Sequence, residues 1–258
     1  MTIKTASQLE GTRIPDVTLK TRREGQWHDL ATGAYFAGRK VVVFALPGAF
    51  TPTCSTSHLP RYDELAPVLR EQGIDEIVCL SVNDAFVMEA WASQQGTANI
   101  TFLPDGNGDL TRALGMLVDK QDLGFGPRSW RYSMLVDDGV IEKAFVEPDQ
   151  PGDPFEVSDA DTMLAYVAPT AATPAEVTIF TKPGCRFCAG AKALLREHGL
   201  RYEEIELGHG VSYSSLHNVT GKRTAPQIYI DGDHIDGLGG LERYFAQRAP
   251  GGQPTAAQ

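Results

Sequence analysis

The chain has 258 residues, 42% of them hydrophobic, and a formal net charge of −10. That length fits one large core or two smaller ones, so the number of domains has to come from patterns along the chain. The acidic balance argues against nucleic-acid partners, because their binding depends on clustered Lys and Arg. The first residues lack the pattern of an export signal, and no apolar run reaches the roughly 20 residues of a membrane span. We therefore expect a soluble, cytoplasmic protein that binds no membrane.

Strands and helices alternate in the first half of the sequence. Arg39–Leu46 is a short apolar run rich in β-branched residues, and two prolines and a glycine then interrupt it. The elements expected next are a helix at Ser55–Arg70, a strand at Glu76–Val82, a helix at Ala85–Gln95, a strand at Thr101–Leu103, a helix starting near Asp109, and strands at Ser133–Val136 and Val140–Val146. Asp137-Asp138-Gly139 between the last two strands predicts a β-hairpin. This order predicts an α/β domain with a mixed sheet.

A stretch without apolar periodicity divides the chain. After an expected helix at Asp159–Val167, the sequence reads APTAATPAE, and such small residues and prolines are typical of a tether. We therefore predict a first domain at 1–167, a linker at 168–175 and a second domain at 176–258. The elements expected in the second domain are a strand at Val177–Phe180, a helix at Phe187–His198, a strand at Tyr202–Ile205, a helix at Tyr213–Val219, strands at Gln227–Ile230 and His234–Ile235, and a helix at Leu241–Arg248. This order is typical of the thioredoxin fold.

The chain has four cysteines, too few for a disulfide framework, so their spacing decides what they do. Cys54 follows a Pro- and Gly-containing loop and stands at the expected N-terminus of a helix. Unpaired backbone N–H groups and the helix dipole favour a thiolate there, and the thiolate is the nucleophilic form of cysteine. A neighbouring guanidinium would favour it further, and Arg128 is our candidate.

Pro47, Thr51 and Cys54 form the string P-x-x-x-T-x-x-C, which resembles the active-site motif of the peroxiredoxins. The surrounding PGAFTPTCS resembles the subgroup named after human peroxiredoxin 5, and the similarity covers about residues 3–167, with Arg128 matched to the family arginine. The resemblance implies that Cys54 attacks the O–O bond of a peroxide. It also implies that Thr51 and Arg128 hold the peroxide oxygens and that Pro47 shields the resulting sulfenic acid.

Two other interpretations of Cys54 remain open at this point. It could be an ordinary helix cysteine, or it could form a hydrolase pair with His58, four residues along the same helix face. A surface histidine is the commoner case, and no oxyanion-hole feature accompanies the pair. Cys79 lies within an apolar strand, where a free cysteine acts as a small buried side chain. Its alternative role is to resolve oxidised Cys54 as a disulfide, which spacing alone does not decide.

The subgroup often carries a distant resolving cysteine near the end of the domain, and this chain has none there. The resemblance therefore implies that another thiol reduces Cys54. The segment DGNGDL at Asp105 resembles the start of a calcium loop, but Leu110 and Met116 stand where such a loop has Gly and Glu. We expect a turn and a helix cap there instead.

Cys185 and Cys188 form the second chemical motif. Cys185-Arg186-Phe187-Cys188 follows an expected strand and Pro183-Gly184, so Cys185 again stands at a helix N-terminus and acts as the nucleophile. The string TKPGCRFC resembles the glutaredoxin motif, although Arg186 replaces a residue that is commonly proline.

Two later segments extend this resemblance. Gly221–Ile230 resembles the glutaredoxin segment that carries a cis-proline and pairs with glutathione, so Pro226 should be cis. His234–Leu241 resembles the stretch that holds the γ-glutamyl end, although glycines stand where an Asp is common. The residues expected to bind glutathione are Lys182, Phe187, Arg223, Thr224, Ala225, Pro226, Gly239 and Gly240.

Other interpretations of the second motif are a zinc half-site and an iron–sulfur cluster shared between subunits. Zinc needs two more thiolate or imidazole ligands, and the sequence has no second C-x-x-C, while His209 and His217 are irregularly placed. Lys182 and Arg223 could also be plain solvated charges. We expect no bound metal or cofactor, and glutathione as the reducing co-substrate.

The whole chain resembles the fused peroxiredoxin–glutaredoxin proteins of bacteria, which implies two thioredoxin-fold domains. The hypothesis is a glutathione-dependent peroxidase that acts on hydrogen peroxide and alkyl hydroperoxides, with Cys54 oxidised and Cys185 restoring it, either alone or with Cys188. The resemblance also implies a homodimer through the first domain, or a tetramer. A redox sensor or holdase, and a general deglutathionylase, are the alternatives.

Overall fold

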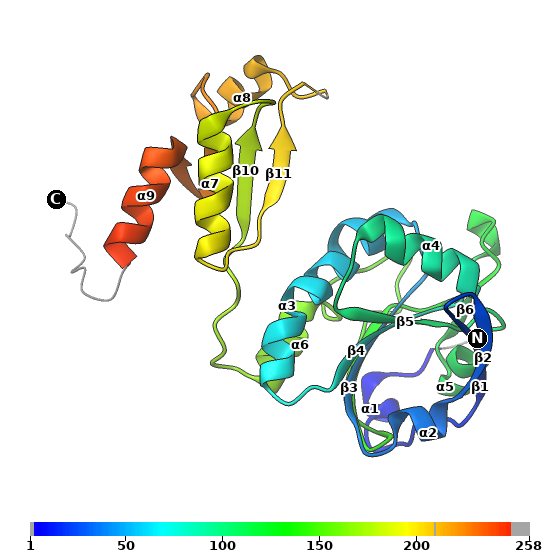
Figure 1. Cartoon of the computed structure of the whole chain (residues 1–258). Coiled ribbons are helices and arrows are strands. Elements are labelled where there is room, and N and C mark those ends of the chain that lie inside the picture. The colour runs from blue at the N-terminus through cyan, green and yellow to red at the C-terminus, as the bar shows by residue number, and fades with distance from the viewer. Residues whose placement is uncertain (1–2, 209, 249–258) are drawn as a thin grey trace. The chain divides into compact units, whose positions relative to one another are not determined.

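The computed structural model describes residues 3–208 and 210–248, and its chain divides into two compact units, Met1–Thr173 and Pro174–Gln258 (Figure 1). The division falls inside the segment 168–175 that the sequence marks as a linker. Each unit has its own hydrophobic core, and each is described by itself below. Among the described residues, no helix combines the length and the apolar character that crossing a membrane requires.

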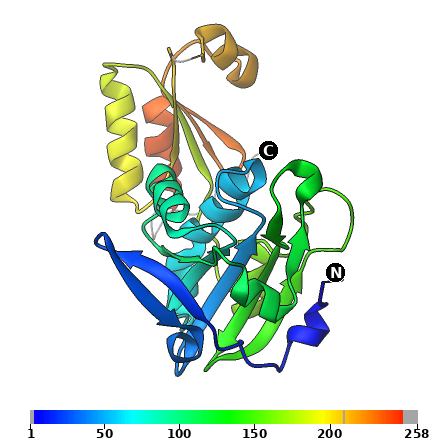
Figure 2. The ribbon, with the colours of Figure 1, turned by 90° about the vertical axis from the view of Figure 1, so that its right-hand side faces the viewer.

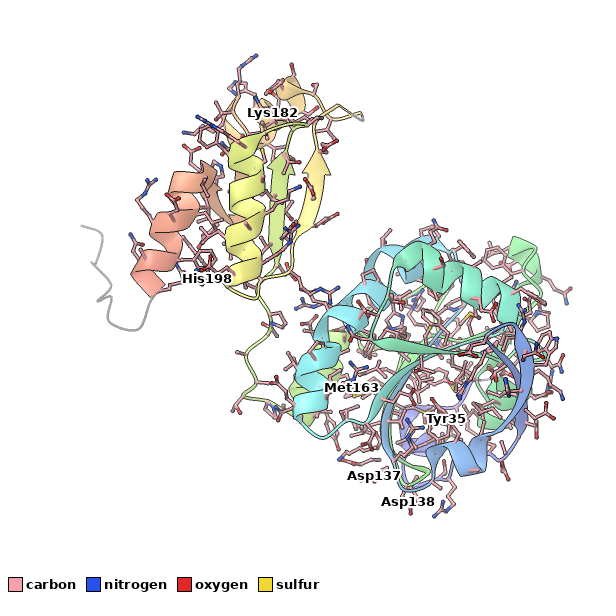
Figure 3. The ribbon with its side chains drawn as sticks, viewed as in Figure 1. Tyr35, Asp137, Asp138, Met163, Lys182 and His198 are labelled. Atoms are coloured by element: carbon pink, nitrogen blue, oxygen red, sulfur yellow. The ribbon has the colours of Figure 1, made fainter. Side chains whose placement is uncertain are left out.

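A five-stranded mixed sheet forms the centre of the first unit. Its strand order is β5 (Ile100–Pro104), β4 (Glu76–Ser81), β3 (Lys40–Leu46), β8 (Tyr132–Asp137) and β9 (Val140–Val146). The neighbours β3, β4 and β5 run parallel, whereas β8 and β9 pair antiparallel. The expected hairpin is confirmed, with Asp138 and Gly139 at φ 45° and 75° in its turn (Figure 3). The mixed sheet expected from the sequence is therefore present.

The central strand β3 shows why the sequence predicts it so clearly. Val41, Val43 and Ala45 pack into the core on one face of the sheet, and Val42, Phe44 and Leu46 pack on the other. Successive side chains of a strand point to opposite faces, so a strand covered on both sides reads as a continuous apolar run. The run ends at Pro47, where the loop to Cys54 begins.

Helices cover both faces of this sheet. On one face, α3 (Leu59–Glu71), α4 (Ala85–Gln95) and α6 (Ala160–Val167) contribute buried side chains such as Leu65, Trp91 and Met163. The opposite face is covered by α1 (Ala6–Leu9), α2 (Thr32–Phe36), α5 (Asp109–Leu114) and the hairpin of β1 (Thr18–Arg23) and β2 (Gln26–Ala31). The β1–β2 hairpin is drawn in blue in Figure 2.

This hairpin and the short elements near it were not predicted from the sequence. The strands read TLKTRR and QWHDLA, which are mostly polar and largely exposed, so they lack the apolar signal of the central strands. Their turn is made by Glu24 and Gly25 in the left-handed region. Three further short elements, β6 (Leu117–Asp119), a 3₁₀ turn (Gln121–Leu123) and β7 (Pro127–Ser129), also went unpredicted.

The helix expected at Ser55–Arg70 begins differently from the prediction. Its first turn, Cys54–His58, is π-helical, and the N–H of Leu59 donates to the carbonyl of Cys54. Pro60 follows at the start of α3, and a proline has no N–H to continue an i to i−4 ladder. The wider turn accommodates this break, and π turns of this kind often occur at functional sites.

The second unit is smaller and has the predicted order of elements. Its sheet runs β11 (Glu203–Glu206), β10 (Val177–Thr181), β12 (Gln227–Ile230) and β13 (Asp233–Asp236), with only β10 and β11 parallel. The helices α7 (Arg186–Glu197) and α9 (Gly237–Arg248) pack together on one face, and α8 (Tyr213–Thr220) packs through Leu216 against Phe180 on the other. Cys185 lies in the short loop between the carboxyl end of β10 and the start of α7.

Candidate active sites

Cys54 lies at the end of a loop that backbone and side-chain hydrogen bonds hold in place. The N–H of Ala49 donates to Oδ1 of Asn83 at 3.0 Å, and the hydroxyl of Thr51 donates to the carbonyl of Gly48 at 2.9 Å. The N–H of Ser55 then donates to the carbonyl of Thr51 at 3.0 Å. These bonds fix the loop after β3 so that the thiol of Cys54 is fully buried in the first turn of the helix.

The guanidinium beside Cys54 belongs to Arg131. Its Nη1 lies 3.5 Å from Sγ of Cys54, whereas Nη1 of Arg128 donates to the carbonyl of Val82. The structure therefore corrects the assignment of Arg128 as the arginine of this site. The physical reason is sheet register: Tyr132 stands opposite Ala45 in the antiparallel pair of β8 and β3, so Arg131 reaches the carboxyl end of β3, where the loop to Cys54 begins.

Asp153 pairs with the same guanidinium. Its carboxylate accepts from Nη2 of Arg131 at 2.6 and 2.5 Å and from Nε at 3.2 Å. Arg131 is only 1% exposed, and the ring of Phe155 lies 5.4 Å from it. Burial works against the charged guanidinium, but the attraction of Cys54 and Asp153 outweighs it and raises the pKa of Arg131. The site therefore holds a permanent positive charge against the sulfur of Cys54.

His58 is buried, which corrects the expectation of a surface histidine. Its Nε2 lies 3.1 Å from the carbonyl of Ser158, and its Nδ1 lies 3.1 Å from Nη1 of Arg131. Burial and the charge of Arg131 lower the pKa of His58 to about 3, so the ring is neutral. A carbonyl can only accept, so Nε2 carries the proton and Nδ1 accepts from Arg131. Both nitrogens are therefore occupied, which argues against a Cys54–His58 hydrolase pair.

The remaining features of the first unit are structural. Cys79 is buried in β4, as expected, and burial together with the neighbouring Cys54 raises its pKa well above the ordinary value. All four cysteines are free thiols. The carboxylate of Asp105 accepts from the N–H groups of Asp109, Leu110 and Thr111, so the expected turn and helix cap is confirmed. Within residues 3–208 and 210–248, no cluster of three His, Cys, Asp or Glu side chains could hold a metal ion.

Cys185 caps the N-terminus of α7. Its Sγ accepts from the N–H of Cys188 at 3.2 Å and lies 3.7 Å from the carbonyl of Ala225. Burial alone would raise the pKa of Cys185, but hydrogen bonds from Cys188 and Phe187 and the charge of Lys182 outweigh it and lower the pKa. Burial and the bond to Cys185 raise the pKa of Cys188 to about 11. The two thiols therefore differ, and Cys185 is the better nucleophile.

The second unit brings several of the expected glutathione contacts around Cys185. The peptide bond between Ala225 and Pro226 is cis, as predicted. The carbonyl of Pro226 lies 3.8 Å from where a Cβ on Gly237 would stand, so the start of α9 adjoins the cis-proline. Lys182 lies at the end of β10, beside the first turn of α7 (Figure 3), and lines a cleft of about 320 Å³ next to Cys185.

Other expected contacts stand apart from the thiol. Arg223 and Thr224 are exposed, although the carbonyl of Thr224 accepts from the buried Gln227 at 3.0 Å. Phe187 is 50% exposed on α7. Gly239 and Gly240 lie in the first turn of α9, where the guanidinium of Arg243 occupies the nearby space. No carboxylate stands at these two positions.

Comparisons with known proteins match both units. The Redoxin family model matches residues 9–164, and the Glutaredoxin model matches residues 177–235. A hybrid peroxiredoxin, hyPrx5, of Haemophilus influenzae is 57% identical over 93% of this chain and 100% of its own length. A peroxiredoxin of Synechocystis is 56% identical over 60% of this chain and 89% of its own length.

Solved structures match the first unit. Reduced Prx3 of Vibrio vulnificus in complex with H2O2 has a TM-score of 0.58 and 44% identity, and covers 61% of this chain and 98% of its own. A 1-Cys peroxiredoxin of Plasmodium falciparum, the antioxidant protein, has a TM-score of 0.60 and 30% identity, and covers 62% of this chain and 99% of its own.

Proposed function

Because this chain belongs to the Redoxin family and is a peroxiredoxin-type peroxidase fused to a glutaredoxin domain, we propose that it uses glutathione to reduce hydrogen peroxide and alkyl hydroperoxides. The observation that carries this proposal is the 3.5 Å contact between the Arg131 guanidinium and the sulfur of the buried Cys54. The thiol of Cys185, whose pKa is lowered, supplies the means to recycle Cys54.

Cys54 performs the first step. Its thiolate attacks one oxygen of the hydroperoxide, the O–O bond breaks, and the leaving oxygen takes a proton to become water or an alcohol. Cys54 becomes a sulfenic acid. Arg131 donates a hydrogen bond to one oxygen, and the hydroxyl of Thr51 turns from the carbonyl of Gly48 to donate to the other, where negative charge develops. Pro47, at the other end of the loop, limits the access of water to the sulfenic acid.

Glutathione performs the second step. Its thiolate attacks the sulfenic sulfur of Cys54, which releases water and leaves a mixed disulfide. The thiolate of Cys185 then attacks the glutathione sulfur, frees Cys54 and carries the glutathione itself. A second glutathione releases oxidised glutathione and regenerates Cys185. Burial raises the pKa of Cys188 and so works against its thiolate, which favours this route over an internal Cys185–Cys188 disulfide.

Glutathione binds along the edge of the second unit that carries Cys185. The backbone at Ala225 and the cis Pro226 lies beside the sulfur, so this segment is suited to pair with the glutathione backbone. Lys182 supplies a positive charge for a carboxylate of glutathione. The other proposed contacts are Phe187, Arg223, Thr224, Gly239 and Gly240. Glutathione as reductant also implies a reducing compartment such as the cytoplasm, with no bound cofactor needed.

A homodimer through the first unit is supported by large exposed apolar side chains in and near the segments that contact one another beside the Cys54 loop. Phe50, Phe86, Leu123 and Phe125 are 49%, 56%, 58% and 41% exposed. The loop of Phe50 is tied to the end of β4 through Asn83, and Arg128 ties the segment of Phe125 to Val82 next to it. Exposed large apolar side chains in neighbouring segments are typical of a protein contact, and the outcome to test in solution is a dimer or a tetramer.

The proposal is tested by following NADPH consumption with tert-butyl hydroperoxide, glutathione and glutathione reductase, with no other thiol carrier added. We expect sustained turnover that Cys54→Ser abolishes and Cys185→Ser reduces strongly. Loss with Cys54→Ser alone would mean that the second unit serves other glutathionylated proteins. If the chain oxidises at Cys54 once and then stops, it acts as a sensor and the proposed cycle is wrong.

A further inference from the structure

All three nitrogens of the Arg131 guanidinium have acceptors. Nη1 faces Cys54 and His58, while Nη2 and Nε both donate to Asp153. A guanidinium has five N–H donors and no acceptor, so its orientation is set by the acceptors around it. Asp153 alone serves two of the three nitrogens.

The contact with Cys54 is the longest that Nη1 makes. It spans 3.5 Å to a sulfur, whereas Nη1 lies 3.1 Å from His58 and Nη2 lies 2.6 Å from Oδ1 of Asp153. Charge-assisted bonds between guanidinium and carboxylate are about twice as strong as neutral ones. If the carboxylate were removed, Nε and Nη2 of a residue only 1% exposed would lose their acceptor. The guanidinium would turn to recover a partner, and its approach to Cys54 would change.

The segment 147–158 acts on Arg131 in two ways, directly through Asp153 and indirectly through His58. Asp153 contacts it directly, and the carbonyl of Ser158 fixes the tautomer of His58, whose Nδ1 then accepts from Arg131. Ser158 is itself held by the buried Glu147, whose Oε1 accepts from the N–H and the hydroxyl of Ser158 at 2.8 and 2.7 Å. Residues of the segment 147–158 thus hold the guanidinium both directly and through His58.

We propose that Asp153 is a positioning residue for the peroxidase reaction: its carboxylate holds Arg131 so that Nη1 faces the sulfur of Cys54 and the incoming peroxide. The inference rests on the proposed role of Cys54 and Arg131. The side chain of Asp153 is 41% exposed, so its loss leaves little unfilled space and affects the reaction through the orientation of Arg131. Asp153 touches neither the sulfur nor the peroxide.

The test uses the full chain in a Cys185→Ser, Cys188→Ser background, in which Cys54 and the buried Cys79 are the only thiols left. The second-order rate constant for oxidation by hydrogen peroxide is measured by stopped-flow fluorescence. Trp91 is a built-in reporter, because its Nε1 donates to the hydroxyl of Ser55 at 3.0 Å, next to Cys54. The rate of alkylation of Cys54 by iodoacetamide is measured in parallel, because that reaction needs no donor to a peroxide oxygen.

We expect Asp153→Ala to slow oxidation about 10- to 100-fold, the range that losing charge-assisted hydrogen bonds to a reacting group gives. Asp153→Asn keeps one acceptor oxygen, so its oxidation rate should lie between those of Asp153→Ala and the parent. Asp153→Glu keeps the carboxylate and should retain most of the parent's rate. The matched control is Asp149→Ala, an exposed carboxylate of the same segment, which should leave the rate unchanged. Alkylation should change much less than oxidation in all four variants.

Two outcomes would overturn the positioning role of Asp153 and leave the proposed function intact. One is fast oxidation in the parent with every Asp153 variant within about twofold of it. The other is an equal loss of oxidation and alkylation, which would indicate a general disturbance of the fold. If the parent itself does not react with peroxide at Cys54, the proposed function fails, and the positioning role falls with it.

Discussion

The two cysteines proposed as nucleophiles both stand at the start of a helix that follows a strand, yet their surroundings differ. Cys185 is partly exposed, and residues within a few positions of it, Lys182, Phe187 and Cys188, set its charge state. Cys54 is fully buried, and its cationic partner Arg131 stands 77 positions away in the sequence. A local site can be inferred from a short motif, whereas a site assembled from distant segments depends on how strands pair.

The largest effect should come from substituting Arg131, the arginine that contacts Cys54. Arg131→Gln removes the guanidinium from the sulfur and should slow oxidation of Cys54 by hydrogen peroxide about 100- to 1,000-fold, as the loss of a donor to developing charge does. Arg128→Gln is the matched control, because that side chain contacts the carbonyl of Val82 instead. Stopped-flow oxidation of the full chain measures both. A larger loss for Arg128→Gln would restore the assignment made from sequence.

The next effect concerns how the buried His58, which contacts Arg131, makes the stability of the chain depend on pH. The unfolded state binds a proton at His58 below about pH 6.5, whereas the folded state does so only near a pKa of about 3. The unfolded state therefore holds more protons between these values, and stability falls as the pH falls, by up to about 1.4 kcal/mol per pH unit. The free energy of unfolding, measured with urea at pH 7 and at pH 5, should fall less with falling pH in His58→Gln than in the wild type. An equal fall in both would mean that the pKa of His58 is not lowered in the folded chain.

A smaller effect is expected at Cys185, whose pKa depends on the neighbouring Cys188. Cys188→Ala removes a side-chain hydrogen bond that lowers the pKa of Cys185, so that pKa should rise. Alkylation of Cys185 by iodoacetamide at pH 7 should then slow about three- to tenfold in a Cys54→Ser background. Cys188→Ser keeps a donor at the same position and should stay close to the parent. Identical rates for both variants would show that backbone N–H groups alone activate Cys185.

The smallest effect is expected at Cys79. Its pKa is raised well above the ordinary value, so its thiol stays protonated and poorly nucleophilic. Cys79→Val should therefore leave steady-state peroxide turnover within about twofold of the wild type, because the change nearly conserves volume. A large fall in turnover, with a Cys54–Cys79 disulfide seen in the oxidised wild type by mass spectrometry, would show that Cys79 resolves Cys54.

Most of the sheet could be predicted from sequence because its strands are buried on both faces. The runs at β3 and β4 are continuous and apolar, and the Asp-Gly turn between β8 and β9 has one favoured geometry. The β1–β2 hairpin was missed because its strands are polar and mostly exposed. The π turn at Cys54 depends on how Pro60 is accommodated, which hydrophobic periodicity does not register.

The site residues that belong to contiguous motifs could also be predicted, whereas those brought together by strand pairing could not. Cys185, Cys188 and the cis Pro226 could be inferred because each belongs to a contiguous motif. Arg131 was missed although it stands three residues from Arg128, because only the register of β8 against β3 distinguishes the two. Asp153 and the burial of His58 gave no signal at all, since an Asp in a Gly- and Pro-rich segment reads as a surface loop. Arg131 directly precedes β8, and this position at the end of a buried strand is the signal in the sequence that marks it.

The division of labour between the two cysteines is tested most directly by intact-mass spectrometry of Cys185→Ser beside the wild type. Both are treated with one equivalent of hydrogen peroxide and then with glutathione. We expect a persistent glutathione adduct on Cys54 in Cys185→Ser, and rapid loss of that adduct in the wild type. If Cys54 of Cys185→Ser returns to the free thiol as fast as in the wild type, glutathione alone recycles the peroxidase and the proposed role of the second unit is wrong.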